Sequence, residues 1–207
     1  MKCKSVLRRA VLARRRALPS QEIRRRSGEV GSLLSALPEF AAARLVMFFV
    51  SFGSEVDTGE MMRGALAAGK RVAAPRAETG MRRLVPYEVR DPEEDLAPGA
   101  HGIREPRSHC AQVELEEIDV VLVPAAVWAE DGYRIGYGAG YYDRFLGRVE
   151  RAVRVGLGLE IQVVPEVPHD SHDLPVDVLV TEAGVRRLGR RAAGARPDEG
   201  GEQWRET

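Results

Sequence analysis

Apolar residues are distributed along this chain in two alternating patterns, short unbroken runs and stripes at helical spacing. The unbroken runs predict strands that are buried on both faces. The stripes predict amphipathic helices, each with one side packed on a core. We expect strands at residues 44–50, 71–75, 82–89, 118–126, 151–159 and 176–182, and helices within 1–18, from Ser20 to Leu37, over 58–68 and over about 140–150.

Residues that break or cap regular structure set the limits of these elements. Pro19 ends the first helix and Ser20 is expected to be the N-cap of the second, while Asp57 and Glu60 stand in positions typical of a capping box. The segment 90–112 is rich in Pro, Gly and charge, and we predict a long loop there. Residues 189–207 are rich in Arg, Gly and Ala without periodicity, which predicts a disordered tail.

Buried strands that alternate with helices predict a single α/β domain over residues 1–188. We expect a three-layer, Rossmann-like architecture, with a mostly parallel sheet and helices on both of its faces. Ligands of such sheets bind beyond the carboxyl ends of the strands. The segment that follows the strand at 118–126 is therefore where a ligand is expected.

Composition narrows the class of protein without naming a function. The chain has 207 residues, of which 44% are hydrophobic and 30% charged, and its formal net charge is zero. A neutral chain has no global field to recruit a polyanion, so we expect no nucleic-acid and no membrane partner. We also expect a monomer. Cys3 and Cys110 form neither a metal motif nor a disulfide framework, which favours the cytoplasm. The longest apolar run, residues 45–50, is too short to span a bilayer, and the N-terminus lacks the apolar core of an export signal.

The stretch GYRIGYGAGYYDRFL, residues 132–146, is the strongest candidate for a binding site. Gly136, Gly138 and Gly140 permit positive φ and leave backbone N–H groups open to an anion. The stretch matches neither a Walker loop nor a dinucleotide fingerprint. Spacing alone leaves two interpretations open, a phosphate site and a tight turn that is packed by aromatic residues and serves structure only.

Asp143 favours chemistry over a purely structural turn. A carboxylate in the first turn of a helix is a common cap, but beside a phosphate it would be repelled unless a cation lay between the two anions. Mg²⁺ suits that position, because it binds one or two carboxylates together with phosphate oxygens. Arg134 and Arg144 could neutralise further charge. Helical spacing groups Tyr142 with Phe145 and Leu146, so we expect at least one of the adjacent tyrosines to be core.

The segment VPAAVWAEDGYRIGYGAGYYDRFL, residues 123–146, resembles the signature of the 5-formyltetrahydrofolate cyclo-ligase family, also called methenyltetrahydrofolate synthetase. In that family a strand ends in Pro-Gly/Ala, and an aromatic residue and Gly-x-Arg-Leu-Gly-x-Gly-x-Gly-Tyr/Phe-Tyr-Asp follow. Three further segments resemble the family in the same order, and they are Lys4–Arg8, Ser54–Thr58 and His172–Asp177. The resemblance covers roughly residues 2–185.

The resemblance implies an enzyme that uses ATP and Mg²⁺ to convert 5-formyltetrahydrofolate into 5,10-methenyltetrahydrofolate, with release of ADP and phosphate. It implies catalytic roles for Arg134 and Tyr141, and metal binding by Asp143 and Asp173. It implies folate binding by Val50, Glu55 and Tyr141. The residues it assigns to ATP are Lys4, Arg8, Arg134, Gly136, Tyr137, Gly138, Ala139, Gly140 and Tyr141.

Each assignment has a simpler alternative. Lys4 and Arg8 would otherwise form part of the solvated face of a helix, since residues 1–26 carry ten Lys or Arg against one acid. Glu55 would otherwise be an exposed loop acid. Ala139 stands where the family often has Lys or Gly, and Trp128 where it usually has Phe, which we expect to be a packing change.

Two other functions remain open from the sequence, whereas a zinc site is disfavoured. The segment from His169 to Asp173 contains two His and two Asp, but histidines three apart do not share a strand face, which argues against zinc. The basic N-terminal helix would suit a non-catalytic relative that binds nucleotide or RNA. A different small-molecule enzyme on a similar sheet, such as a sugar-phosphate isomerase, would need no ATP.

Overall fold

The computed structural model describes residues 3–99 and 102–188, so the predicted disordered tail lies outside the described residues. The helices are α1 (Lys4–Arg16), α2 (Ser20–Ser35), α3 (Pro38–Ala42), α4 (Gly59–Ala67), α5 (Pro92–Asp95) and α6 (Tyr141–Leu146), with single 3₁₀ turns at η2 (Leu115–Glu117) and η3 (Glu160–Gln162). The strands are β1 (Leu45–Met47), β2 (Arg71–Glu78), β3 (Arg83–Val89), β4 (Leu96–Pro98), β5 (Arg104–Pro106), β6 (Val120–Val123), β7 (Val127–Ala129), β8 (Arg134–Ile135), β9 (Val153–Leu157), β10 (Val163–Val164), β11 (Val178–Thr181) and β12 (Gly184–Arg187).

A seven-stranded sheet in the order β12-β11-β9-β6-β1-β2-β3 forms the centre of the molecule. The pairs from β11 to β2 are parallel, and β12 and β3 add an antiparallel strand at each edge. The chain moves from β1 outward to β2 and returns on the other side of β1 as β6, so the strand order reverses between β1 and β6. Ligands of doubly wound sheets bind at such a reversal.

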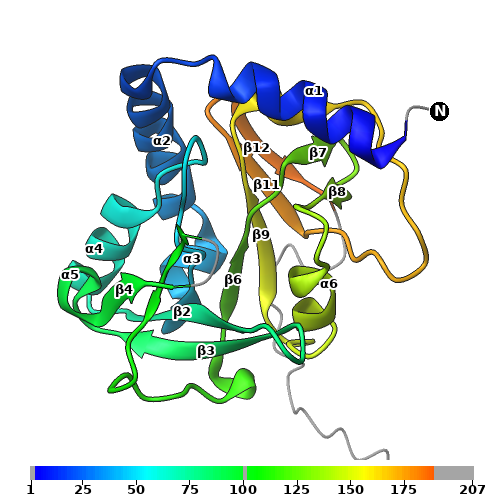
Figure 1. Cartoon of the computed structure of the whole chain (residues 1–207). Helices are drawn as coiled ribbons and strands as arrows, with labels where there is room; N and C mark the ends of the chain where they lie inside the picture. The colour runs from blue at the N-terminus through cyan, green and yellow to red at the C-terminus, as the bar shows by residue number, and fades with distance from the viewer. Residues whose placement is uncertain (1–2, 100–101, 189–207) are drawn as a thin grey trace, which may run out of the picture.

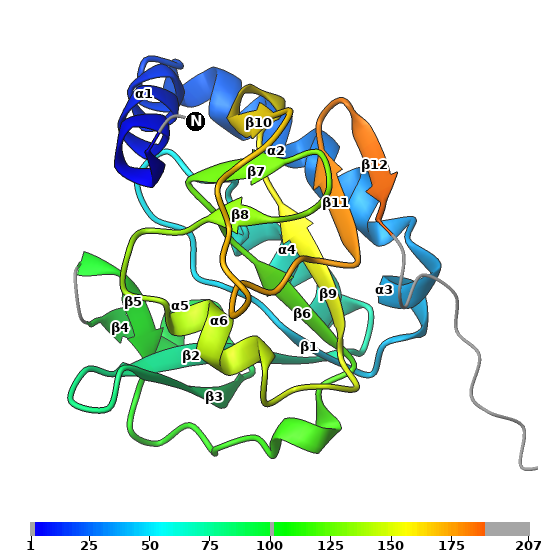
Figure 2. The same cartoon turned by 90° about the vertical axis from the view of Figure 1, so that its right-hand side faces the viewer.

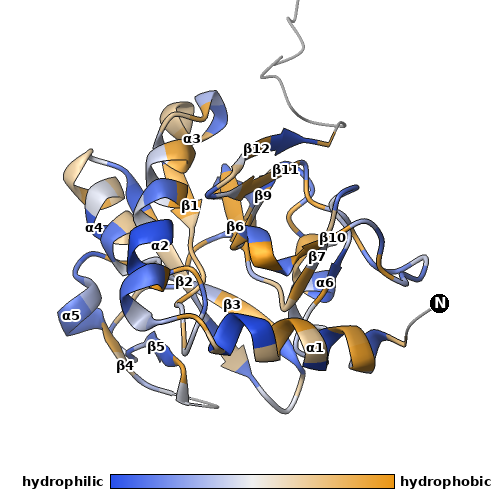
Figure 3. Ribbon diagram, turned by 90° about the horizontal axis from the view of Figure 1, so that it is seen from above, coloured by the Kyte–Doolittle hydropathy of each residue, from blue (hydrophilic) through white to orange (hydrophobic). Residues whose placement is uncertain are grey.

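Helices and a small sheet cover the two faces of the central sheet, which confirms the predicted α/β class. Helices α2, α3 and α4 lie on one face (Figure 1), where residues such as Leu34, Phe40 and Met62 pack on Val46 and Phe48. Helix α6 and the small sheet β10-β7-β8 lie on the other face (Figure 2). The hydropathy colouring shows the same arrangement, with hydrophobic residues concentrated on the central strands and hydrophilic ones on the outer surface of α2 (Figure 3).

Helix α1 belongs to neither layer. It crosses the end of the sheet where β6 finishes (Figure 1), and its Val11 packs with Ala126 and Val127, which follow β6. Within the described residues, no helix has the length and apolar character needed to cross a membrane. Because α1 lies over the carboxyl ends of the strands, its inward side chains meet the segments where a ligand is expected.

Several sequence predictions were wrong in detail. Ser20 is the first residue of α2 and its N-cap is Pro19, with no side-chain bond. Asp57 does cap α4 by accepting from Gly59 N at 2.9 Å, although the N-cap position itself is Thr58. Strand β2 continues through Pro75 to Glu78, since Pro75 pairs with Pro86 at the edge. The predicted loop 90–112 contains α5, β4 and β5, and strands β7, β8, β10 and β12 were not predicted.

Trp128 fills the space between the small sheet and the central one. Its side chain is fully buried, and a Cβ added at Gly156 or Gly158 would lie 2.6 Å from the indole ring. The glycines of the run RVGLGL are therefore explained by the tryptophan opposite them. The expected packing role of Trp128 agrees with this geometry.

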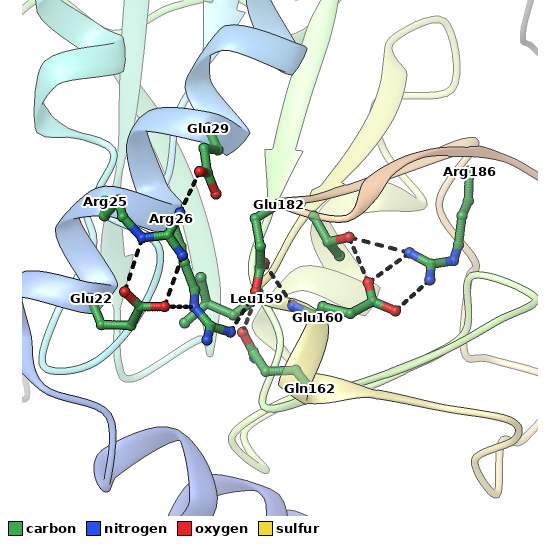
Figure 4. Close-up of polar contacts among 10 residues, drawn as sticks. Glu22, Arg25, Arg26, Glu29, Leu159, Glu160, Gln162, Glu182 and Arg186 are labelled. Carbon is green, nitrogen blue, oxygen red and sulfur yellow. Dashed lines mark hydrogen bonds and ion pairs between the residues drawn. The ribbon is translucent and has the colours of Figure 1, made fainter.

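A polar network joins α2 to the two loops at the end of β9 and β11 (Figure 4). Arg26 bridges Glu22 and Glu182, each at 2.7 Å, while Arg186 bonds Glu160. Beneath these ion pairs the buried Gln162 accepts from Leu159 N and donates to Ala125 O at 2.7 Å. The network holds α2 and the loops after β9 and β11 together near the carboxyl ends of β1 and β6.

Candidate active site

The glycine-rich loop between β8 and α6 has an open backbone. Gly138 and Gly140 have φ values of 110° and 65°, a region that only glycine enters easily. Among the described residues, none of the N–H groups of residues 136–140 donates a hydrogen bond to a protein acceptor. Consecutive free amides in such a loop form a concavity suited to an anion.

Two arginines brace this loop through its carbonyl groups. Arg8 Nε donates to Gly136 O at 2.8 Å, and Arg144 donates to Ala139 O at 2.6 Å. A Cβ at Gly138 would lie 3.6 Å from the Arg8 guanidinium, so the arginine covers the loop closely. Because the two arginines bind carbonyl groups of the loop, its N–H groups remain available for a negatively charged ligand.

Arg134 is a buried cation at the base of the loop. It donates to Asp143 Oδ1 and to Leu174 O, each at 2.6 Å, and its side chain is only 4% exposed. Burial lowers the pKa of Arg134, and the charges of Asp143 and Asp173 oppose that shift. Both carboxylates therefore lie within electrostatic reach of one guanidinium.

Lys4 holds the second of these carboxylates. Lys4 Nζ donates to Asp173 Oδ2 at 2.8 Å and to Asp170 Oδ2 at 3.0 Å. Burial alone would raise the pKa of Asp173, but the bonds from Lys4 and from the Asp170 amide lower it overall. Asp143 Oδ2 and Asp173 Oδ1 have no protein partner among the described residues, so each aspartate keeps one oxygen for a ligand.

Glu55 is buried at the end of the β1–α4 loop, so the alternative of an exposed loop acid was wrong. Its Oε1 accepts a short hydrogen bond from the Tyr137 hydroxyl, and its Oε2 accepts from Phe52 N at 3.2 Å. Burial raises the pKa of Glu55, and these bonds together with the charge of Arg15 oppose the rise. Phe52 and Tyr137 are both exposed, with ring centroids 5.5 Å apart at 55°. Val50 is partly buried beside this loop.

The two tyrosines that begin α6 differ in their surroundings. Tyr142 packs against both halves of the core, as helical spacing predicted for at least one of the pair. Its hydroxyl is fully buried and has no hydrogen-bond partner among the described residues, and burial raises its pKa. Tyr141 is partly buried, and the Arg144 guanidinium lies 5.8 Å from its ring centroid.

The His169–Asp173 segment does not form a histidine metal site in this structure. His169 stacks on Tyr133 with ring centroids 3.7 Å apart, and Asp173 is occupied by Lys4. Within the described ranges, one group of three ligand-type residues lies close together, namely Asp95, His109 and Cys110. Asp95 already bonds His109 at 2.8 Å and the Arg90 amide at 2.7 Å, which explains the group as a clip that closes the β5 loop.

Comparison with known proteins identifies the lineage of this site. A model of the 5-formyltetrahydrofolate cyclo-ligase family matches residues 1–182. The chain belongs to this family. The 5-formyltetrahydrofolate cyclo-ligase of Mycolicibacterium smegmatis is 31% identical over 192 residues, which cover 89% of this chain and 97% of the relative. That of Escherichia coli is 29% identical over 175 residues, covering 83% of this chain and 96% of the relative.

A solved structure agrees with the family assignment. The NMR structure of 5,10-methenyltetrahydrofolate synthetase from Aquifex aeolicus matches with a TM-score of 0.80 and 38% identity, over 95% of this chain and 98% of that chain. The resemblance inferred from the sequence motifs is thereby confirmed. The chain is accordingly an enzyme of the cyclo-ligase family, and the roles of its individual residues are proposals.

The candidate site contains residues that sequence reasoning missed. Arg15 is 3% exposed and bonds Tyr137, whereas the sequence placed it on the basic outer face of the first helix. Phe52 was not singled out, although its amide binds Glu55. The period of α1 carried a signal, because Arg15 lies four positions after the buried Val11 on the same face.

A hollow of about 800 Å³ lies between α2, α3 and α4, and none of the predicted site residues lines it. Small residues of α2 and α4, among them Gly28 and Gly64, line it. The candidate site is therefore defined by convergent chemistry at the strand reversal rather than by the size of a cavity.

Proposed function

We propose that this chain converts 5-formyltetrahydrofolate into 5,10-methenyltetrahydrofolate, using ATP with Mg²⁺ and releasing ADP and phosphate. Family membership supports the reaction. One observation supports the site: the free amides of residues 136–140 lie beside Asp143, and both Asp143 and Asp173 keep an oxygen without a protein partner. Amides that bind phosphate next to carboxylates that bind a cation are what a nucleotide–magnesium site requires.

The chemistry solves a leaving-group problem. The formyl oxygen of the substrate is an amide oxygen and leaves poorly. Transfer of the γ-phosphoryl group to that oxygen breaks the bond to the β,γ-bridging oxygen, which departs with ADP, and gives an iminium phosphate. Nitrogen 10 then attacks the activated carbon and loses its proton, and phosphate leaves with the former formyl oxygen. The protein accelerates such steps by alignment and by stabilising charge.

The residues around the loop suit the triphosphate. We assign the phosphates to the loop amides, Lys4, Arg8 and Arg134. Arg8 uses only its Nε for Gly136 O, so its two terminal nitrogens remain as donors. Arg134 is fixed by two bonds and buried, which makes it a preorganised cation for charge that develops during transfer. Tyr141 borders the same loop and is assigned to both substrates.

The donor set fits Mg²⁺. Two carboxylates with one unused oxygen each match the usual mode of this ion, which takes few protein ligands and completes its shell with phosphate and water. When bound, the ion would neutralise phosphate charge and orient the γ-phosphoryl group. Asp143 and Asp173 would hold it, and Lys4 and Arg134 supply the positive charge around them in this structure.

Glu55 suits the folate end of the site. A carboxylate offers about four acceptor positions, and the protein fills two of those on Glu55. The remaining two can accept the paired N–H groups of a pterin ring, with Val50 and Tyr141 as neighbours. We further propose a monomer in the cytoplasm that acts on folate and ATP, without nucleic-acid or membrane partners.

The test is the ultraviolet absorbance of the methenyl product, followed with and without ATP and Mg²⁺. Product that forms only with both supports the proposal. Product without ATP, or none from clean substrate, contradicts it. Salt-sensitive RNA binding without folate binding in calorimetry would favour the RNA-binding alternative. Asp173→Asn should lose turnover, and Asp170→Asn is the matched control because it also removes a Lys4 partner, with a side chain that is 77% exposed.

A further inference from the structure

We propose that Arg15 is a positioning residue of the folate site: it fixes the Tyr137 hydroxyl, and through it the Glu55 carboxylate, in the arrangement that receives the donor pair of a pterin ring. The inference rests on the proposed function. It adds a residue from α1 to the folate end of the site, whereas the family resemblance assigned the N-terminal segment to ATP alone.

The hydrogen bonds of Arg15 reach three separate segments. Its Nε donates to Ser54 Oγ at 3.0 Å in the β1–α4 loop, and one terminal nitrogen donates to Tyr137 Oη at 3.0 Å in the glycine-rich loop. The other terminal nitrogen lies 3.5 Å from Ala125 O after β6. The first and the last of these segments follow β1 and β6, between which the order of the sheet reverses, so one guanidinium joins both sides of the candidate site to the glycine-rich loop.

The chemistry of arginine fixes the direction of the hydrogen bonds. A guanidinium donates and has no acceptor, so the Tyr137 oxygen must accept from Arg15. The tyrosine proton is then directed to Glu55 Oε1, with which the hydroxyl is in contact. The chain therefore runs from Arg15 through Tyr137 to Glu55 and leaves the carboxylate as the terminal acceptor. A terminal acceptor with unfilled positions is what a ligand with two N–H groups requires.

A purely structural role would not call for a buried arginine. The side chain is 3% exposed, and a buried cation needs compensation. Within the described part of the chain, no carboxylate lies within ion-pair distance of Arg15, so its charge acts on Glu55 only across the tyrosine. A neutral side chain could pack beneath the loops without that desolvation. A buried arginine at position 15 is therefore explained by its effect on Glu55, whose carboxylate has to stay ionised.

The groups that face Glu55 come from four segments of the chain. Arg15 from α1 and the Tyr137 hydroxyl from the glycine-rich loop favour the ionised carboxylate, as does the Phe52 amide of its own loop. Tyr142 from α6 also lies within electrostatic reach of Glu55. Burial raises the pKa of Glu55, so loss of the Arg15 charge should raise it further. As pH falls, folate binding would then be lost at a higher pH than in the parent enzyme.

The experiment compares three adjacent arginines of one helix. Arg15→Met is tested against Arg14→Met and Arg16→Met, because both neighbours are exposed and have no assigned role. Calorimetry measures binding of 5-formyltetrahydrofolate without ATP, and kinetics give kcat and KM for each substrate from pH 5 to 9. For Arg15→Met we expect folate affinity to fall about tenfold or more, since a charge-assisted bond is lost. The KM for ATP should change much less than the folate affinity, and the acidic limb of the folate pH profile should move to higher pH.

Two further variants separate the effect of the Arg15 charge from that of its shape, and they still test the inference if Arg15→Met misfolds. Arg15→Lys keeps the charge but not the fork of donors, so the acidic limb should stay in place while folate affinity falls. Tyr137→Phe keeps Arg15 but removes the hydroxyl between it and Glu55, and it should weaken folate binding in the same direction. If Arg15→Met does not fold, these two variants give the answer.

Specific results would overturn the inference. Unchanged folate affinity and an unchanged acidic limb in the folded Arg15 variants would remove Arg15 from the site. Equal losses for folate and ATP, with a lower melting temperature, would assign it a structural role only. Failure of the proposed function has a different signature, because a parent protein that binds folate in calorimetry but forms no methenyl product contradicts the reaction and leaves the binding comparison intact.

Discussion

The buried hydroxyl of Tyr142 leads to a prediction in which stability and activity move in opposite directions. The hydroxyl has no partner among the described residues, while the ring packs on both halves of the core. Leaving a buried hydroxyl unsatisfied costs about 1–3 kcal/mol. Tyr142→Phe removes that cost and leaves a void smaller than a water molecule, which takes back a few tenths of a kcal/mol. We expect a net gain of about 1 kcal/mol, or a rise in melting temperature of roughly 2–4 °C for a chain of this size.

The same substitution should impair the enzyme. The Tyr142 hydroxyl lies within electrostatic reach of both Glu55 and Arg134, the groups assigned to the folate and phosphate ends of the site. A buried hydroxyl in that position is explained if a substrate supplies the missing partner. We expect kcat/KM to fall about tenfold, the loss of one hydrogen bond to a bound substrate. Urea unfolding, thermal unfolding with and without 5-formyltetrahydrofolate, and the absorbance assay measure the two effects.

A matched control is Tyr133→Phe, because Tyr133 is partly exposed, stacks on His169 and packs only at the margin of the small apolar cluster beside α1. It should change neither stability nor turnover appreciably. A less stable and equally active Tyr142→Phe protein would refute the reasoning, since it would mean that the hydroxyl already has a partner, such as a buried water. A stabilised and fully active variant would keep the burial argument and remove the substrate contact.

Three further predictions follow from the same geometry. Asp143→Asn should reduce turnover at least tenfold and also destabilise the fold by about 1–3 kcal/mol in urea, because it leaves the buried Arg134 without its ion-pair partner; full activity would remove Asp143 from the metal site. Gly158→Ala should cost about 1–3 kcal/mol, since its Cβ would lie 2.6 Å from Trp128, and Trp128→Phe should recover part of that loss in a double-mutant cycle. The folded-state pKa of Asp173 lies below its unfolded value. The stabilisation that its ionised carboxylate gives the fold is therefore present above about pH 4 and is lost as pH falls through the folded value. Lys4→Met should flatten that part of the profile of stability against pH.

The parts of the fold that the sequence predicted are those decided by unbroken apolar runs. The strands β1, β6, β9 and β11 lie within four of the predicted runs; three of them are buried throughout, and β9 is buried over its last three residues. The strands that were missed are short or exposed. β8 and β10 have two residues each, and β12 alternates intermediate and exposed positions. Their pairing depends on contacts between distant segments, which local pattern does not record.

The candidate site was predicted from the resemblance to the cyclo-ligase family, and its internal bonding was not. The resemblance assigned Lys4 to phosphate, and nothing in the sequence indicated that its ammonium group also bonds Asp170 and Asp173. It placed Tyr137 in the nucleotide loop, but the hydroxyl contacts Glu55 of another loop. Such pairs join residues far apart in the chain, so only the three-dimensional structure can reveal them. Arg15 was missed although it shares a helix face with Val11, because it lies in a run of basic residues and its hydrogen-bond partners are in distant segments.

Three buried polar groups near the strand reversal have an energetic cost in the free protein. Glu55 and Arg134 are both largely buried, and burial disfavours the charged form of each. Tyr142 adds a hydroxyl that has no partner among the described residues and lies within electrostatic reach of both. A fold selected for stability alone would replace these groups with apolar residues of similar volume. Their concentration at the strand reversal is explained if pterin N–H groups, phosphate oxygens and a cation complete their bonding, and substrate binding should then raise the free energy of unfolding more in the parent than in Tyr142→Phe.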